Sequence, residues 1–151
     1  MAREESAVFT TLCMLSDGKG NILVEDRKDP DWPGVCFPGG HVEPCESFTE
    51  AAVREMREET GLTVLDPVLC GVKQFQTNNG ERYVVFLYKA TQWTGNLQSS
   101  NEGEVFWIPR EDLPKYKTVT DFADMVKVME SDTLNEFYYY KKNGNWSLKL
   151  L

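Results

Sequence analysis

The sequence is poor in the residues that build several common kinds of site. It has a single histidine, His41, and four cysteines, no two of which form a C-x-x-C pair. Zinc sites in proteins use several cysteine and histidine ligands at short spacing. We therefore expect no zinc site, and we interpret the cysteines as reduced thiols that pack like small apolar side chains.

The sequence also lacks a long apolar run and a basic stretch. No apolar segment approaches the roughly 18 residues that suggest a membrane span, and the acidic start at residues 1–6 is unlike a secretory signal. The net charge of −8 disfavours binding to a long nucleic acid. We expect a cytoplasmic protein that binds neither membrane nor long nucleic acid. A small phosphorylated substrate is still compatible with this charge if a metal ion supplies positive charge.

The chain of 151 residues suits one domain, residues 1–151. A turn at 17–21 predicts that strands at 8–15 and from 22 onward form a hairpin, and Asn143-Gly144 predicts a second hairpin at 136–151. The prolines of residues 28–34 favour a loop. Further strands are expected at residues 62–75 with a break near 66–67, at 82–91 after a hairpin turn at Asn78-Asn79-Gly80, and at 105–108. With two helices, this pattern indicates an α+β fold with a sheet and helices packed on it.

The first helix has clear signals at both ends. Ser47 and Glu50 have the spacing of a capping box, and Gly61 suits a C-terminal stop, which predicts a helix over residues 48–60. A second helix is expected over residues 121–130, because its apolar residues recur on one face.

Three glutamates on the first helix suggest a metal site. Glu55, Glu58 and Glu59 share an arc of about 100°, on the side that also carries apolar residues. Partly buried like charges repel one another, so such a cluster persists more readily around a divalent cation. Carboxylate oxygens suit Mg²⁺ or Mn²⁺. The helix alone is equally compatible with a solvated acidic face.

The surrounding residues match a named pattern. Gly40 is followed after five residues by Glu46, and seven residues later comes the run Arg54-Glu-Met-Arg-Glu-Glu-Thr-Gly-Leu62. This arrangement resembles the Nudix box at every specified position, counting Met56 as aliphatic. The flanking strands and the second helix also resemble the Nudix fold, an α/β/α sandwich with a mixed sheet between helices.

The resemblance implies roles for individual residues. Glu55, Glu58 and Glu59 match metal-binding glutamates, and the Gly40 carbonyl is a further ligand candidate. Arg54 matches an arginine that orients a box glutamate, and Glu46 a structural acid near the helix start. Glu102 and Glu104 are alternative candidates for an additional loop glutamate, with an exposed turn acid as the alternative for each. The sequence does not decide which carboxylate, that of Glu55, Glu102 or Glu104, accepts the proton of an attacking water.

The resemblance implies a Mg²⁺-dependent hydrolase, for which Mn²⁺ is an alternative ion, acting on a nucleoside polyphosphate. Similarity to the MutT-like subgroup points to a pyrophosphohydrolase that converts 8-oxo-dGTP to the monophosphate and diphosphate. Alternatives are another Nudix substrate (a dinucleoside polyphosphate, a nucleotide sugar or a capped RNA end) and a non-catalytic binding module. The sequence leaves open whether the protein forms a homodimer.

Candidate substrate-binding residues lie on both sides of the box. Gly39 and Gly40 let backbone approach a ligand. Arg27 is a candidate phosphate contact or a surface charge at a strand end. Trp32 and Phe75 are candidate walls for the base or ordinary core residues, and Asp121 is a candidate base-edge reader or a first-turn helix acid.

Overall fold

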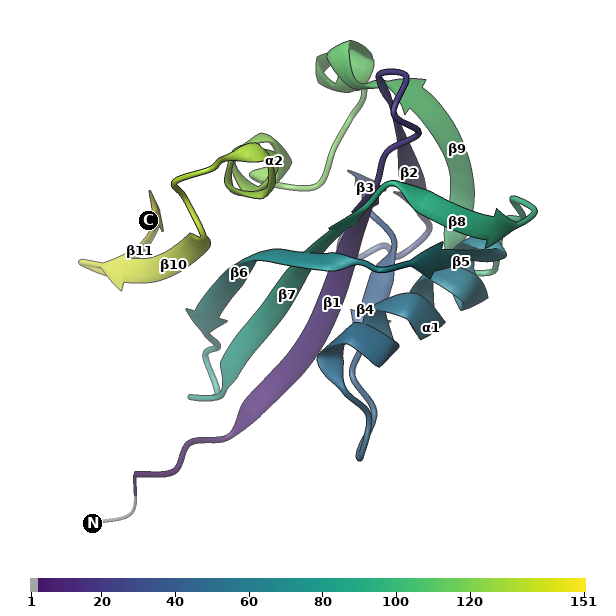
Figure 1. Cartoon of the computed structure of the whole chain (residues 1–151). Coiled ribbons are helices and arrows are strands. Elements are labelled where there is room, and N and C mark those ends of the chain that lie inside the picture. The colour runs from purple at the N-terminus through teal and green to yellow at the C-terminus, as the bar shows by residue number, and fades with distance from the viewer. Residues whose placement is uncertain (1–2) are drawn as a thin grey trace.

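The computed structural model describes residues 3–151, and its largest element is a six-stranded mixed sheet (Figure 1). From one edge to the other, its strands are β11 (Asn145–Leu150), β10 (Glu136–Lys142), β6 (Val68–Gln76), β7 (Arg82–Ala90), β1 (Ala7–Leu15) and β4 (Gly39–His41). A three-stranded sheet contains β3 (Gly34–Cys36), β2 (Asn21–Arg27) and β9 (Gly103–Pro109). A two-stranded sheet pairs β5 (Leu62–Leu65) with β8 (Gln92–Gly95).

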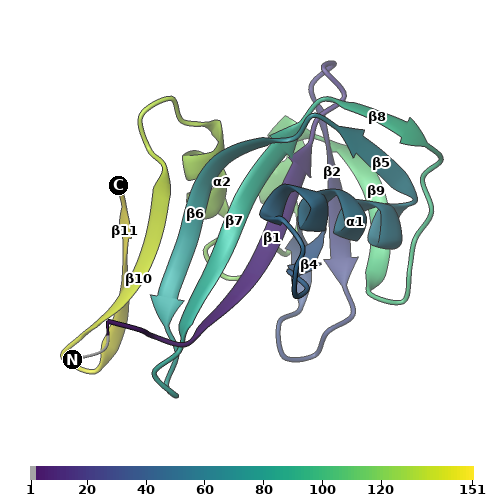
Figure 2. The same ribbon diagram turned by 60° about the horizontal axis from the view of Figure 1, so that its bottom comes forward.

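Helices α1 (Phe48–Thr60) and α2 (Phe122–Glu130) cover opposite faces of the main sheet (Figure 2). Side chains of β1 alternate between these faces. Leu12 and Met14 pack in one apolar cluster with the buried residues of α2, whereas Cys13 and Leu15 pack in another with those of α1. Burial on both sides explains why β1 reads as an apolar run rather than as an alternating strand. The expected α/β/α sandwich with a mixed sheet is confirmed.

The predicted first helix is confirmed at both ends. The Ser47 hydroxyl accepts a hydrogen bond from the Glu50 N–H, and the Glu50 carboxylate accepts one from the Ser47 N–H. Gly61 ends α1 in the left-handed region, with φ of 75°, and its N–H donates to the Arg57 carbonyl. The cap thus sets where the helix begins and where its glutamates point.

The predicted hairpin of the first two strands is wrong. Strand β1 pairs with β4 on one edge and with β7 on the other, so neither edge is free for β2. Strand β2 pairs instead with β3 and β9 in another sheet. Next to the turn, an isolated antiparallel β-bridge between Ser16 and Ile22 joins the end of β1 to the start of β2. The turn residues therefore predicted where the chain reverses direction, but not which strands pair with one another.

The expected break near residue 66 is confirmed, because Asp66 has φ of 47° and divides β5 from β6. Hairpins β6–β7 and β10–β11 are also confirmed. The sequence patterns did not predict strands β3, β4 and β8 or the 3₁₀ helix Arg110–Lys115, which are too short to carry a recognisable period. None of the helices in residues 3–151 has the length and apolar character needed to cross a membrane.

Candidate active site

A cavity of about 720 Å³ lies against the main sheet and extends across its strands from β4 toward β10. Its wall includes carboxylates from α1 at one end and aromatic side chains from β6, β7 and β10 at the other. Strands β4, β1, β7 and β6 lie side by side, and neighbouring strands are about 4.8 Å apart. The two ends are therefore separated by roughly three such spacings, so one ligand that fills both must be elongated.

Glu59 lies in the acidic end of the cavity. Its residue is 5% exposed, and its carboxylate accepts a hydrogen bond of 2.9 Å from the Gly39 N–H. Burial, and after it the neighbouring Glu25 carboxyl, raise the pKa of Glu59 to about 9. Two carboxyl groups with little solvent and few donors thus share this part of the site.

Glu25 was not predicted from the sequence. It lies on β2 and is 1% exposed, and among residues 3–151 its hydrogen-bonding neighbour is the Glu59 carboxyl, which keeps its proton and donates to Glu25. Burial is the main cause of its raised pKa. The sequence does show an acidic residue at the end of the buried run Ile22–Glu25. It does not indicate that β2 brings this residue next to Glu59.

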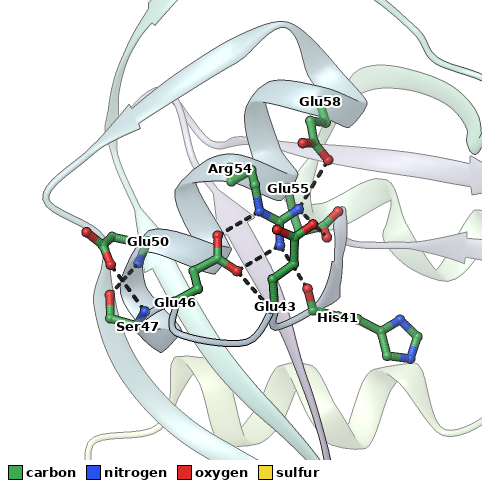
Figure 3. A network of polar contacts seen from close by, with 8 residues as sticks. All are labelled: His41, Glu43, Glu46, Ser47, Glu50, Arg54, Glu55 and Glu58. Atoms are coloured by element: carbon green, nitrogen blue, oxygen red, sulfur yellow. Dashed lines mark hydrogen bonds and ion pairs between the residues drawn. The ribbon is translucent and has the colours of Figure 1, made fainter.

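Arg54 organises the other carboxylates at the start of α1 (Figure 3). Its guanidinium donates to both oxygens of Glu46, at 2.7 and 3.0 Å, and to Glu55 Oε1 at 2.8 Å. It also donates to the His41 carbonyl at 2.9 Å, which ties the helix to the end of β4. The expected pairing of this arginine with a glutamate of the motif agrees with this geometry.

Glu55 faces the Gly40 backbone across the cavity wall. A Cβ added to Gly40 would lie 2.5 Å from the Glu55 carboxyl carbon, so only glycine allows this approach. Burial raises the pKa of Glu55, although the hydrogen bond from Arg54 acts in the opposite direction.

Glu58 departs from the expected burial of all three helix glutamates. Its side chain is 55% exposed, compared with 13% for Glu55, and it pairs with Arg54 at 3.2 Å. At about 100° per residue, the buried arc of α1 ends just before Glu58. Glu58 therefore lies at the rim of the site, while Glu55 and Glu59 line the cavity.

The structure separates the two loop glutamates that the sequence could not distinguish. Glu102 lines the cavity together with Glu55 and Glu59. Glu104 is paired with Asp26 across β9 and β2 and lines a different hollow. Of the two, the structure brings only Glu102 to the acidic end.

Arg27 and Trp32 lie together at the cavity wall. The Arg27 guanidinium is 4.7 Å from the centre of the Trp32 ring, and its Nε donates to the Trp32 carbonyl at 3.3 Å. It also pairs with Asp29 at 3.6 Å. Phe75 lines the aromatic end and stacks on Tyr83, with ring centres 5.2 Å apart.

Asp121 lies behind the aromatic end rather than in its wall. It is the N-cap residue of α2 but makes no side-chain capping hydrogen bond. Its carboxylate instead accepts a hydrogen bond from the Tyr139 hydroxyl, and the cavity is lined here by Thr120 and Tyr139. This arrangement does not support the expected direct contact with a base, whereas the alternative, an acid at the start of the helix, agrees with the position of Asp121.

Lys73 is a second residue that sequence reasoning missed. It lies on β6, lines the cavity and is 8% exposed. Its ammonium is 5.2 Å from the ring centres of Phe137 and Tyr139 and 5.7 Å from that of Trp32. The alternation of side chains along β6 could have indicated this position, because Lys73 and Phe75 are two residues apart and therefore lie on the same face of the strand.

The acidic end fits a divalent cation in its chemistry. Glu55 and Glu59 supply oxygen donors in the cavity wall, and the buried Glu25 carboxyl adjoins Glu59, so a cation there would offset buried negative charge. Within residues 3–151, no three acidic, thiol or imidazole groups already converge as a closed metal cluster. A cation here would thus draw further oxygens from water and from phosphate groups, as Mg²⁺ commonly does.

Comparison with known proteins places this geometry in a family. The model of the NUDIX domain matches residues 8–129, which include α1, all of α2 but its last residue, and the whole acidic end. The chain belongs to the Nudix family. The resemblance inferred from Gly40 to Leu62 is therefore confirmed over most of the chain.

Individual Nudix relatives agree with this result. The chain is 32% identical over 108 residues to the uncharacterised Nudix hydrolase YvcI of Bacillus subtilis, covering 68% of this chain and 66% of that protein. It is 29% identical over 119 residues to the human 8-oxo-dGDP phosphatase NUDT18, covering 76% of this chain and 36% of the relative. The chain thus spans less than two thirds of the length of these curated relatives.

A solved structure has the same fold over nearly the full chain. The MutT protein of Bacillus halodurans superimposes with a TM-score of 0.76 at 28% identity, covering 95% of this chain and 97% of that one. The fold expected from the sequence is therefore shared with a MutT protein from end to end.

Proposed function

We propose that this Nudix protein is a Mg²⁺-dependent pyrophosphohydrolase of nucleoside triphosphates, with 8-oxo-dGTP as its preferred substrate. The observation that carries the proposal is one elongated cavity with carboxylates at one end and stacked aromatic rings at the other. A nucleotide has matching parts, because its phosphates attract a cation and its base stacks on aromatic side chains.

The acidic end supplies the cation ligands. Glu55 and Glu59, in the cavity wall, would hold Mg²⁺ together with the adjoining Glu25, with the Gly40 carbonyl as a further ligand and Glu58 at the rim. Bound there, Mg²⁺ would neutralise phosphate charge and lower the pKa of an attacking water. Mn²⁺ is also compatible with these oxygen donors.

The residues of the chain orient the reacting groups. Arg54 fixes Glu55 by a charge-assisted hydrogen bond, so this carboxylate faces the Gly39-Gly40 backbone in one direction. Glu55 and Glu102 both line the cavity and are the candidates to accept the proton of the attacking water. Arg27, at the cavity wall, is the candidate contact for the outer phosphates.

The names of the relatives support an oxidised guanine nucleotide. NUDT18 is named as an 8-oxo-dGDP phosphatase, and the similar structure is that of a MutT protein. The aromatic end of the cavity is consistent with a base, with Trp32 and Phe75 in its wall. A diphosphate such as 8-oxo-dGDP is the second candidate substrate, and the NUDT18 match favours it.

A nucleotide panel tests the proposal. We expect 8-oxo-dGTP to give 8-oxo-dGMP and diphosphate in the presence of Mg²⁺, identified by chromatography, with activity lost when the cation is chelated. Parallel reactions with 8-oxo-dGDP, dGTP, a dinucleoside polyphosphate and a nucleotide sugar separate the alternatives. A higher kcat/KM for dGTP, the dinucleoside polyphosphate or the nucleotide sugar than for 8-oxo-dGTP, or hydrolysis of none, would contradict the proposal, and a higher value for 8-oxo-dGDP would favour the second candidate.

A further inference from the structure

Lys73 is a buried cation that is attracted by Asp121 only over a longer distance and makes no direct polar contact within residues 3–151. Of the residues in the described part of the chain, none forms an ion pair with its ammonium or accepts a hydrogen bond from it. The nearby Asp121 carboxylate is engaged by the Tyr139 hydroxyl. The other neighbouring group is Cys36, whose pKa burial raises to about 12, so it is a neutral thiol at pH 7.

Leaving this ammonium in the fold is costly. A buried charge without a partner is destabilising, and the faces of Trp32, Phe137 and Tyr139 offset only part of that cost. Burial correspondingly lowers the pKa of Lys73. An ordinary core position would carry an apolar side chain, so the position of Lys73 in the cavity wall points to a bound group as its partner.

The surroundings of Lys73 define the chemistry of that group. A lysine ammonium has three donors and no acceptor, so its partner must carry an acceptor. Aromatic residues Trp32, Phe75 and Tyr83 also line the cavity, so the partner fits a planar ring. The α1 carboxylates lie at the opposite end, about three strand spacings away, so a phosphate held there through a cation would be remote from Lys73.

We propose that Lys73 is a specificity-determining residue that donates a hydrogen bond to the 6-oxo oxygen of a purine base. This inference rests on the proposed nucleotide substrate and deepens it. The edge of guanine presents O6 and N7 as acceptors, which lysine recognises in other settings, whereas adenine presents a donor at N6. An ammonium at this position therefore favours 6-oxopurines and disfavours 6-aminopurines.

The same chemistry limits what Lys73 distinguishes. Guanine and 8-oxoguanine both carry O6, so Lys73 recognises a feature that they share. Oxidation changes the ring at C8 and puts a proton on N7. Discrimination between the two guanines must then come from other residues, and loss of Lys73 is expected to affect both alike.

The test compares Lys73→Met with Lys89→Met. Methionine has a similar length and no donor, and Lys89 on the adjacent strand β7 contacts the Met129 carbonyl outside the cavity. Binding of dGMP, dIMP and dAMP is measured by calorimetry without metal, so the readout does not depend on catalysis. We expect the parent protein and Lys89→Met to bind dGMP and dIMP more tightly than dAMP. In Lys73→Met this preference should fall by roughly 5- to 150-fold, the usual range for one good base-edge contact.

Hydrolysis provides the second readout. In Lys73→Met, kcat/KM for dGTP and 8-oxo-dGTP should fall by similar factors, and the triphosphate of 2,6-diaminopurine should be a poor substrate for the parent protein. The melting temperature of Lys73→Met should stay level or rise, because a buried charge is removed.

The outcomes separate the two proposals. Equal binding of dGMP and dAMP by the parent protein, no binding of either, or an unchanged preference in Lys73→Met would overturn the assignment of Lys73. Absence of triphosphate hydrolysis together with a preference that depends on Lys73 would instead refute the proposed reaction and leave the base contact standing.

Discussion

Replacing Gly40 with alanine should damage catalysis while leaving the fold intact. The new Cβ would lie 2.5–2.7 Å from the three terminal atoms of the Glu55 carboxylate, and an ordinary contact begins near 3.4 Å. The carboxylate must then retreat by nearly an ångström. Such a displacement of a catalytic group costs on the order of 10²-fold in rate. We expect kcat/KM with Mg²⁺ to fall by about that factor.

The stability of Gly40→Ala separates this explanation from general damage. The clash involves the far end of one side chain, so the melting temperature should change little. Gly39→Ala is the contrasting variant, because its Cβ would overlap the Thr11 carbonyl of the adjacent strand β1. That change should lower the melting temperature markedly. Turnover by Gly40→Ala within about threefold of the parent value would refute the argument that glycine is needed to place Glu55.

Three further predictions concern the acidic end. Arg54→Ala should lower kcat by about 10²-fold, because Glu55 loses its fixed direction, while Mg²⁺ binding measured by calorimetry persists. Equal turnover by the variant and the parent protein would remove Arg54 from the site. Glu102→Gln should lower kcat more than Glu104→Gln, since only Glu102 lines the cavity, and equal losses in steady-state assays would contradict this. Glu25→Gln should weaken Mg²⁺ binding by about 10-fold or more, while its melting temperature without metal stays level or rises, because a buried charge is removed; unchanged Mg²⁺ affinity would exclude Glu25 as a ligand.

The sequence predicted most reliably what depends on neighbours along the chain. Helix α1 was predicted with both ends, because Ser47, Glu50 and Gly61 act within a few residues of one another. The box glutamates belong to the same segment, so their common arc followed from helix geometry alone. The break at Asp66 and the C-terminal hairpin were also encoded locally.

Features that depend on distant pairing were not predictable in this way. Glu25 joins the site only because β2 lies beside β9 and near the end of α1, and nothing within β2 encodes that position. Lys73 reads as a polar residue in an alternating strand, and its burial results from packing of β10 and the Trp32 loop around it. Asp121 had the sequence position of a capping acid, yet its carboxylate is engaged by Tyr139 from β10.

The position of β1 between β7 and β4 has a consequence for how the chain folds during synthesis. Its partners come much later in the sequence, since Ala7 pairs with Arg82 and Leu15 with Ala90. The segment Leu12–Leu15 is fully apolar and is buried only after those residues have left the ribosome. Because long-range pairing of parallel strands is slow, this segment stays exposed for most of translation. A chain that stops before β7 would thus present an unpaired apolar strand, the form most prone to aggregate.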